Sequence, residues 1–100
     1  MDAVLYRRGI HLFNQGEFFA AHEVLEDCWR AAETSQKRFL QGLVQAAVAL
    51  HHHSTGNLAG ARSLLARSAR NLGSYPPDFA GLELPSLLRD LEQWRLALET

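Results

Sequence analysis

The fold is decided by the stretch from Phe39 to Leu50, which reads FLQGLVQAAVAL. Its apolar side chains cover almost the whole circumference of a helix, whereas a surface helix carries a single apolar stripe. We therefore expect a central helix over about residues 36–53. Gly42 and Ala46 lie four residues apart, on one face, where their small size would let another helix approach closely.

Two segments before this stretch and two after it also have the helical period of 3.6 residues. Glycine, proline and capping residues separate these segments. Thr34 and Ser35 are expected to cap the central helix, and Asn57 to cap the helix after it. No segment alternates as a strand would. The expected helices cover about residues 2–15, 18–33, 36–53, 58–72 and 84–98.

The two halves of the chain align with an offset of 40 residues. Two hairpins of one design followed by a closing helix predict an all-α five-helix bundle, in a single domain over residues 1–100. The identical pairs are His11/His51, Gly16/Gly56, Ala21/Ala61, Leu25/Leu65 and Arg30/Arg70.

Composition excludes several classes of function. The net charge is −1, so no bulk attraction draws the chain to nucleic acid or to an anionic membrane. No apolar stretch approaches the roughly 20 residues of a spanning helix, and the first residues lack the order of a signal peptide. The single Cys28 forms no internal disulfide, which is consistent with the cytoplasm. We expect a cytoplasmic protein with neither nucleic-acid nor membrane partners.

The candidate site starts from an imidazole and two carboxylates in the second helix. They are His22, Glu23 and Glu26, which fall within a stretch of five residues. His22 falls inside the apolar side of this helix and Glu26 at its edge, one turn away, whereas Glu23 falls on the polar back. On the central helix, Gln41, Gln45 and His52 share one narrow stripe. Because polar groups on a buried helix need partners, we expect the two sets to face each other.

This juxtaposition predicts a polar pocket of His22, Glu23, Glu26, Gln41 and Gln45 between the second and third helices. One interpretation is a structural hydrogen-bond network that fixes the register of the two helices. The others are a ligand site, or a site that performs chemistry. In the second hairpin Arg62 and Ala66 replace His22 and Glu26, so the hairpin can form without the pair.

Two blocks of sequence, residues 13–30 and 39–50, resemble the family called domain of unknown function 309. The first block includes Gly16-Glu17-Phe18-Phe19, His22-Glu23-Val24-Leu25-Glu26-Asp27 and Trp29-Arg30. The resemblance implies an all-helical bundle without an established activity. Members are often described as predicted metal-dependent hydrolases, a description that would rest here on the pattern His22-Glu23-x-x-Glu26.

A metal would need a third ligand, because a catalytic zinc takes three from the protein. His22, Glu26 and His52 are the candidate ligands for a divalent metal such as zinc. We expect a small helical binding or interaction module, with a metal-dependent hydrolase built on these three residues as the alternative. We also expect a homodimer, because a 100-residue bundle gains stability when another copy covers its apolar surface.

Overall fold

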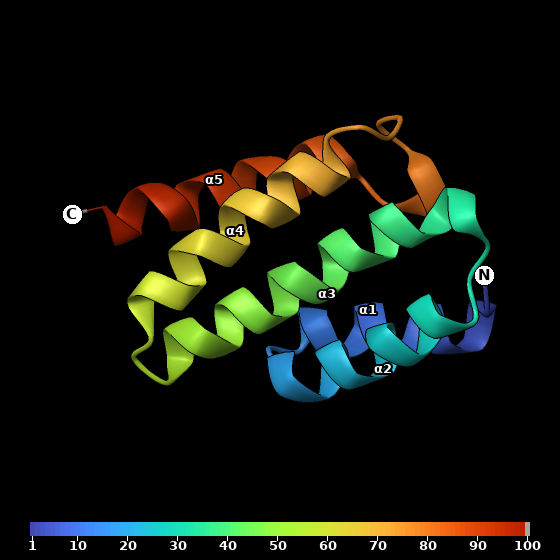
Figure 1. Cartoon of the computed structure of the whole chain (residues 1–100), viewed down its shortest axis with the longest axis horizontal. Helices are drawn as coiled ribbons and strands as arrows, with labels where there is room; N and C mark the ends of the chain where they lie inside the picture. The colour runs from blue at the N-terminus through green and yellow to red at the C-terminus, as the bar shows by residue number, and fades with distance from the viewer. Residues whose placement is uncertain (100) are drawn as a thin grey trace.

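The computed structural model describes residues 1–99, which form five α-helices and one short 3-10 helix. Figure 1 shows the hairpin of α1 and α2 on one side of α3, with α4 and α5 on the other side. The predicted all-α class, with two helical hairpins and a closing helix, is confirmed. The elements are α1 (Ala3–Asn14), α2 (Phe18–Arg30), α3 (Thr34–Ser54), α4 (Leu58–Leu72), η1 (Phe79–Gly81) and α5 (Leu84–Leu98).

The central position predicted for α3 is also confirmed. It packs against α2 and α4, while α1 packs on α2 and α5 on α4. Gly42 allows a close approach of α4, because a Cβ atom there would lie 2.8 Å from Cγ of Leu72. The side chains that α3 buries are those of Phe39, Leu40, Leu43, Ala46, Ala47, Ala49 and Leu50.

The internal repeat is reproduced at both hairpin turns. Gly16 has φ of 79° and Gly56 has φ of 86°, a left-handed conformation that glycine adopts without steric cost. The backbone N–H after each glycine donates to equivalent carbonyls, Glu17 to Leu12 and Asn57 to His52, both at 2.9 Å. The two turns therefore have one geometry, although their flanking side chains differ.

The repeat extends into the core between the helices of each hairpin. Ser68 Oγ donates to the carbonyl of Gly42 at 2.7 Å, and its counterpart Cys28 places Sγ 3.7 Å from the carbonyl of Asp2. Asp2 and Gly42 are themselves 40 residues apart, so both hairpins hold the same cross-helix contact. Burial raises the pKa of the Cys28 thiol, and the Asp2 carboxylate adds to the rise. Cys28 therefore acts here as a small buried side chain.

Helix boundaries differ from the prediction mainly where α2 meets α3. The helix predicted to reach Glu33 ends at Arg30, and Thr34 and Ser35 form the first turn of α3 instead of capping it. Predicted hydroxyl caps were wrong because Glu33, in extended conformation, occupies the cap position. The cap predicted at Asn57 is confirmed, because Asn57 Oδ1 accepts from the backbone N–H of Gly60 at 3.0 Å.

Aromatic side chains hold the segment between α4 and α5 against the start of α3. The ring of Phe39 lies 5.5 Å from that of Tyr75 and 4.9 Å from that of Phe79. Tyr6 donates its hydroxyl to the carbonyl of Ala80 at 3.1 Å, and thereby connects α1 to η1. Ala80 adopts φ of 53°, so this contact stabilises a conformation that alanine rarely takes.

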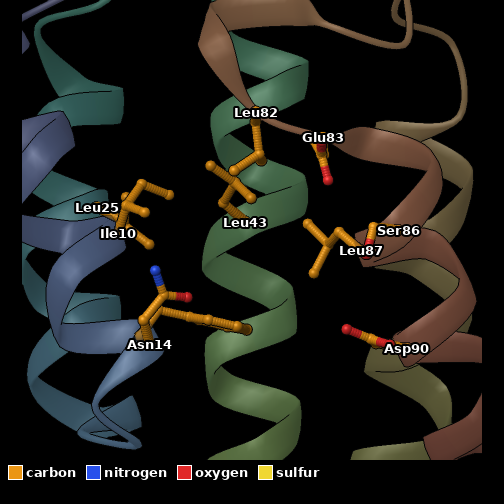
Figure 2. A pocket seen from close by; sticks show the side chains of 10 residues that line it. Ile10, Asn14, Leu25, Leu43, Leu82, Glu83, Ser86, Leu87 and Asp90 are labelled. Carbon is orange, nitrogen blue, oxygen red and sulfur yellow. The ribbon is translucent and has the colours of Figure 1, made fainter.

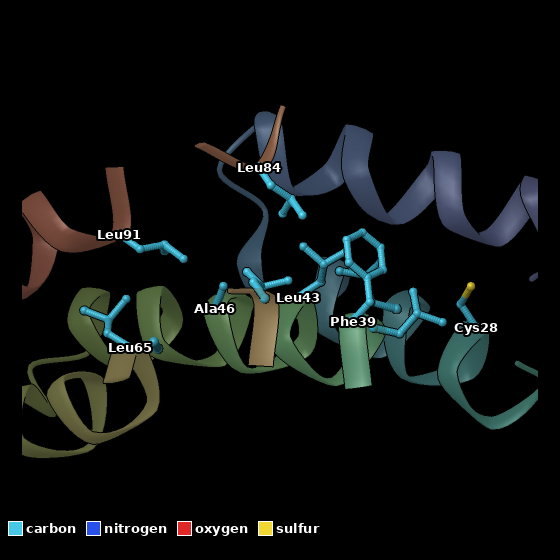
Figure 3. Close-up of a cluster of buried hydrophobic side chains, with 11 residues drawn as sticks. Cys28, Phe39, Leu43, Ala46, Leu65, Leu84 and Leu91 are labelled. Carbon is cyan, nitrogen blue, oxygen red and sulfur yellow. The ribbon is translucent and has the colours of Figure 1, made fainter. Parts of the chain in front are cut away.

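The hydrophobic core runs along α3 and draws side chains from both hairpins and from α5. Figure 3 shows Phe39, Leu43 and Ala46 of α3 between Cys28 on one side and Leu91 on the other. Leu84 and Leu91 of α5 are buried almost completely, so the closing helix completes this core. Within residues 1–99, no helix has the length and hydropathy to cross a membrane.

The contact between Ser68 and Gly42 predicts that Ser68→Ala lowers the free energy of unfolding. The loss should be about 0.5–1.5 kcal/mol, since the variant removes one buried hydrogen bond and leaves a small void. Urea denaturation measures the change. Ser63→Ala, at an exposed position of the same helix, is the matched control and should shift stability by less than about 0.5 kcal/mol. Equal stability of the Ser68 variant and the wild type would contradict the prediction.

Burial of Tyr6 predicts a loss of stability in alkali. Desolvation raises the pKa of Tyr6 to about 12, while a tyrosine in the unfolded chain titrates near 10. The folded state thus keeps a proton that the unfolded state releases, and this contribution is present below about pH 10 and lost as the pH rises through 12. Denaturant unfolding at pH 8 to 12 should show a shallower decline for Tyr6→Phe than for the wild type. An equal decline in the free energy of unfolding for both proteins would show that Tyr6 does not control the loss of stability in alkali.

Candidate functional site

His22 makes two contacts, one with a backbone carbonyl and one with a carboxylate. Its Nδ1 lies 2.8 Å from the carbonyl oxygen of Phe19, and its Nε2 lies 3.6 Å from Oε2 of Glu26. A carbonyl oxygen only accepts, so Nδ1 carries the proton and Nε2 faces the carboxylate. The predicted neighbourhood of His22 and Glu26, one helical turn apart, is present in the structure.

The pair lies at the surface of α2 and belongs to a chain of charges. The side chain of His22 is 21% exposed and that of Glu26 is 42% exposed. Arg30 donates to the second oxygen of Glu26 at 3.2 Å and also pairs with Asp27. Helical pairs with this exposure contribute only a few tenths of a kcal/mol each. Glu23 is exposed on the same helix, so its place in the polar pocket stays a prediction that this position does not support.

The two glutamines do not complete a pocket with His22. Gln45 Oε1 accepts a hydrogen bond from Asn71 Nδ2 of α4 at 2.8 Å, and Arg38 donates to the other end of the Asn71 amide at 3.1 Å. Gln41 is exposed. The predicted convergence is therefore wrong for Gln45, whose partner is on α4 and not on α2. The physical reason is its spacing from Gly42: Gln45 follows by three residues and so shares the face against which α4 packs.

The structure brings His51, rather than His52, next to α2. The ring of Phe19 lies 5.1 Å from the ring of His22 and 5.2 Å from that of His51. His52 contacts the ring of His51 at 6.3 Å. In residues 1–99, no three His, Cys, Asp or Glu side chains lie together in a way that could hold a metal ion. The ligand set of His22, Glu26 and His52 stays a prediction, which this geometry does not support.

A concave site that the sequence did not predict is a cleft between α1 and α5. It has a volume of about 340 Å³, with Ile10 and Phe13 of α1 on one wall and Leu87 of α5 on the other. Leu43 of α3 lies between the walls, as Figure 2 shows. The cleft opens because α1 packs on α2 and α5 on α4, so the two helices flank α3 on opposite sides.

This cleft continues in both directions as a groove along α1 and α5. Toward the start of α1, it runs past Arg7 to Ala80. Toward the end of α5, a second hollow of about 230 Å³ extends it to Leu50 and Trp94. Early residues of α1 thus face Ala80 to Leu82, just before α5, and late residues of α1 face α5 itself. The chain therefore runs in the same direction along both walls of the groove.

Two carboxylates line the α5 side of the cleft, Glu83 and Asp90, and both are exposed. Neither has a side-chain hydrogen bond or ion pair within the described part of the chain. The other acids of α5 differ: Glu92 accepts from Arg95 at 2.6 and 2.9 Å, and Glu99 pairs with the same guanidinium. Hydrogen bonding from Arg95 lowers the pKa of Glu92. The cleft therefore combines an apolar floor with two unpaired negative charges.

A sequence signal for this cleft existed in the repeat. In each hairpin, the first helix would line one face and the second helix would cover the other. Repeat proteins built from stacked helical hairpins bind ligands on the concave face lined by equivalent helices. Here that face belongs to α1, α3 and α5, whereas the predicted polar pocket lay between α2 and α3.

The fold and the site define a class: a small all-α protein of two repeated helical hairpins and a closing helix, with a cleft between its first and last helices. A family model described as domain of unknown function matches residues 6–64, more than half of the sequence. The chain belongs to this family, the domain of unknown function 309, as its two sequence blocks had indicated.

One solved structure shares the fold, and two sequence relatives are described as uncharacterized. A solved structure of the conserved hypothetical protein TTHA0068 from Thermus thermophilus is similar over 95% of this chain and 96% of that one, with 32% identity and a TM-score of 0.76. An uncharacterized protein of Aquifex aeolicus (strain VF5) is 29% identical over 93 residues, which are 92% of this chain and 28% of that protein.

A further relative is the uncharacterized protein YpuF of Bacillus subtilis (strain 168). It is 44% identical over 57 residues, which are 56% of this chain and 33% of YpuF. The chain thus spans a third or less of the length of these two curated relatives.

The contacts of His22 predict a modest structural contribution. His22→Ala should lower the free energy of unfolding by about 0.5–1.5 kcal/mol, because it removes one hydrogen bond to backbone and one helical pair with Glu26. Thermal melts of metal-free protein measure this, with His11→Ala as the control at an exposed position. A variant as stable as the wild type would indicate that function, rather than folding, retains the imidazole.

Zinc titration of the same proteins, purified without a nickel column, tests the metal alternative. With only two adjacent ligands, we expect no stoichiometric binding at micromolar zinc. One-to-one binding by the wild type that His22→Ala abolishes would contradict this expectation and support the site of His22, Glu26 and His52.

Proposed function

We propose that this protein is a binding module whose ligand occupies the cleft between α1 and α5. The observation that carries the proposal is the composition of the cleft, where apolar side chains from four helices surround a volume of about 340 Å³. Ligand sites are usually concave, mostly apolar and provided with a few polar groups that orient the ligand. Ser86 and the two carboxylates are such groups here.

Family membership defines no reaction, since the matching family is described as one of unknown function and both relatives as uncharacterized. A cytoplasmic setting, in keeping with the free thiol of Cys28, belongs to the same proposal. In the expected homodimer, a second copy would cover the exposed Leu96 of α5. Leu96 does not line the cleft, so this contact would leave the cleft accessible. The hydrolase alternative depends on the zinc titration described above.

The site that contains His22 is a weaker candidate for the ligand. Its side chains are partly exposed and already paired along α2, whereas the cleft combines enclosed apolar surface with polar groups that lack partners. Apolar enclosure gives a ligand more binding free energy than an exposed ion pair does. We therefore assign the binding role to the cleft.

A neutral apolar dye such as Nile red, combined with NMR of leucine methyl groups, tests the proposal. Binding should shift the methyl signals of Leu82 and Leu87 and leave those of the exposed Leu58 on α4 unchanged. Asn14→Trp, at an exposed position that faces the cleft, should reduce dye binding roughly tenfold or more, because an indole would fill much of the space.

The matched control is Asn14→Ala, which removes the amide without blocking the cleft and should bind the dye like the wild type. Circular dichroism of both variants checks that they are folded. Dye binding that Asn14→Trp leaves unchanged, or methyl shifts spread over the whole surface, would contradict a ligand site in the cleft.

A further inference from the structure

The groove has the shape of a site for one more helix. Its walls are two helices that run in the same direction, and its floor is a third, so a helical ligand would pack as the helices of the bundle pack on each other. From Leu84 to Trp94 the α5 wall extends about 15 Å, which matches roughly three turns of a ligand helix. Extended peptides usually bind by adding a strand to a sheet edge, and residues 1–99 contain no strand.

Charge identifies the chemistry of that helix. Glu83 and Asp90 are seven positions apart, which is about two helical turns, and both line the α5 side of the cleft. Each lacks a cationic partner in the described residues, in contrast to the acids paired with Arg95. On the opposite wall, Arg7 and His11 of α1 line the end of the groove next to Ala80. The groove is thus negative along α5 and carries the positive charge of Arg7 at one end of α1.

We propose that the cleft binds an amphipathic helix of a protein partner, which lays an apolar face on the floor and directs two basic side chains, seven residues apart, to Glu83 and Asp90. This inference rests on the proposed function and names its ligand class. The apolar face supplies most of the affinity, and the two ion pairs at the rim fix the orientation and register of the helix.

A second copy of this chain fits the groove less well. Two copies placed groove to groove would face each other with concave surfaces and enclose a hollow, whereas a single helix is convex and fills it. Overlaying two α5 helices would also place acids opposite acids, which is unfavourable. A basic helix from another protein satisfies both the shape and the charge.

A panel of 14-residue helical peptides tests the inference. All share one leucine face and differ at two flanking positions seven residues apart, which carry Lys, Gln or Glu. Fluorescence anisotropy with the wild-type protein should show the Lys peptide binding about three- to tenfold more tightly than the Gln peptide, and the Glu peptide more weakly than either. Raising the salt concentration should reduce these differences.

The protein variant Glu83→Gln/Asp90→Asn should remove the order among the three peptides and leave the affinity for the Gln peptide within about twofold of wild type. Both positions are exposed and without partners in the structure, so the substitutions should not disturb folding. The matched control is Glu23→Gln/Glu33→Gln, which removes two exposed carboxylates from the α2 side of the molecule. This control should preserve the preference for Lys.

The outcomes separate this inference from the proposed function. Peptides that bind with equal affinity whatever their charge, and that Asn14→Trp excludes, would overturn the basic helix and leave the apolar cleft as the ligand site. Failure of both the dye and all peptides to bind would overturn both proposals. Sedimentation that shows a dimer dissociated by Asn14→Trp would identify a second copy as the occupant and overturn the inference.

Discussion

The burial of α3 on nearly all its sides is the constraint on which the rest of the structure depends. The apolar stretch of α3, residues 39–50, is stable in water only when other helices cover it, and the chain supplies α2 on one side and α4 on the other. The contact with α4 needs a residue without a side chain at one point, which is Gly42 against Leu72. The same approach brings Gln45 to Asn71 and so commits the polar stripe of α3 to α4.

The two hairpins show how one structural design supports different surroundings. Their turns, their buried alanine and leucine pairs and the contacts of Cys28 and Ser68 are equivalent. The position of His22 in the first hairpin is occupied by Arg62 in the second, and Arg62 donates to the carbonyl of Leu98 at 2.9 Å. That bond satisfies a carbonyl at the end of α5. One repeat position thus holds a surface imidazole in one copy and anchors the closing helix in the other.

The cleft is a consequence of this hairpin order. Each outer helix, α1 and α5, is attached through its own partner, α2 or α4, and neither is drawn fully across the face of α3 that they share. The remaining space has an apolar floor and walls because the same residues also belong to the core. Its charged rim comes from α5, where two carboxylates form no ion pair within residues 1–99 while two others share Arg95. A binding surface therefore arises where the core remains open.

The sequence by itself determined the helical class, the hairpin repeat, the central place of α3 and the pairing of His22 with Glu26, because periodicity and spacing along one helix are local properties. It did not determine the direction of Gln45 or the neighbour of Phe19, since the rotation of one helix against another depends on which small residue accepts the closest approach. The repeat indicated only that α1, α3 and α5 could share one face, and it did not identify the walls of the cleft, which are residues from opposite ends of the chain, such as Phe13 and Leu87. Only tertiary packing places those residues face to face, because the distance between α1 and α5 is fixed by the helices between them and not by any motif within either.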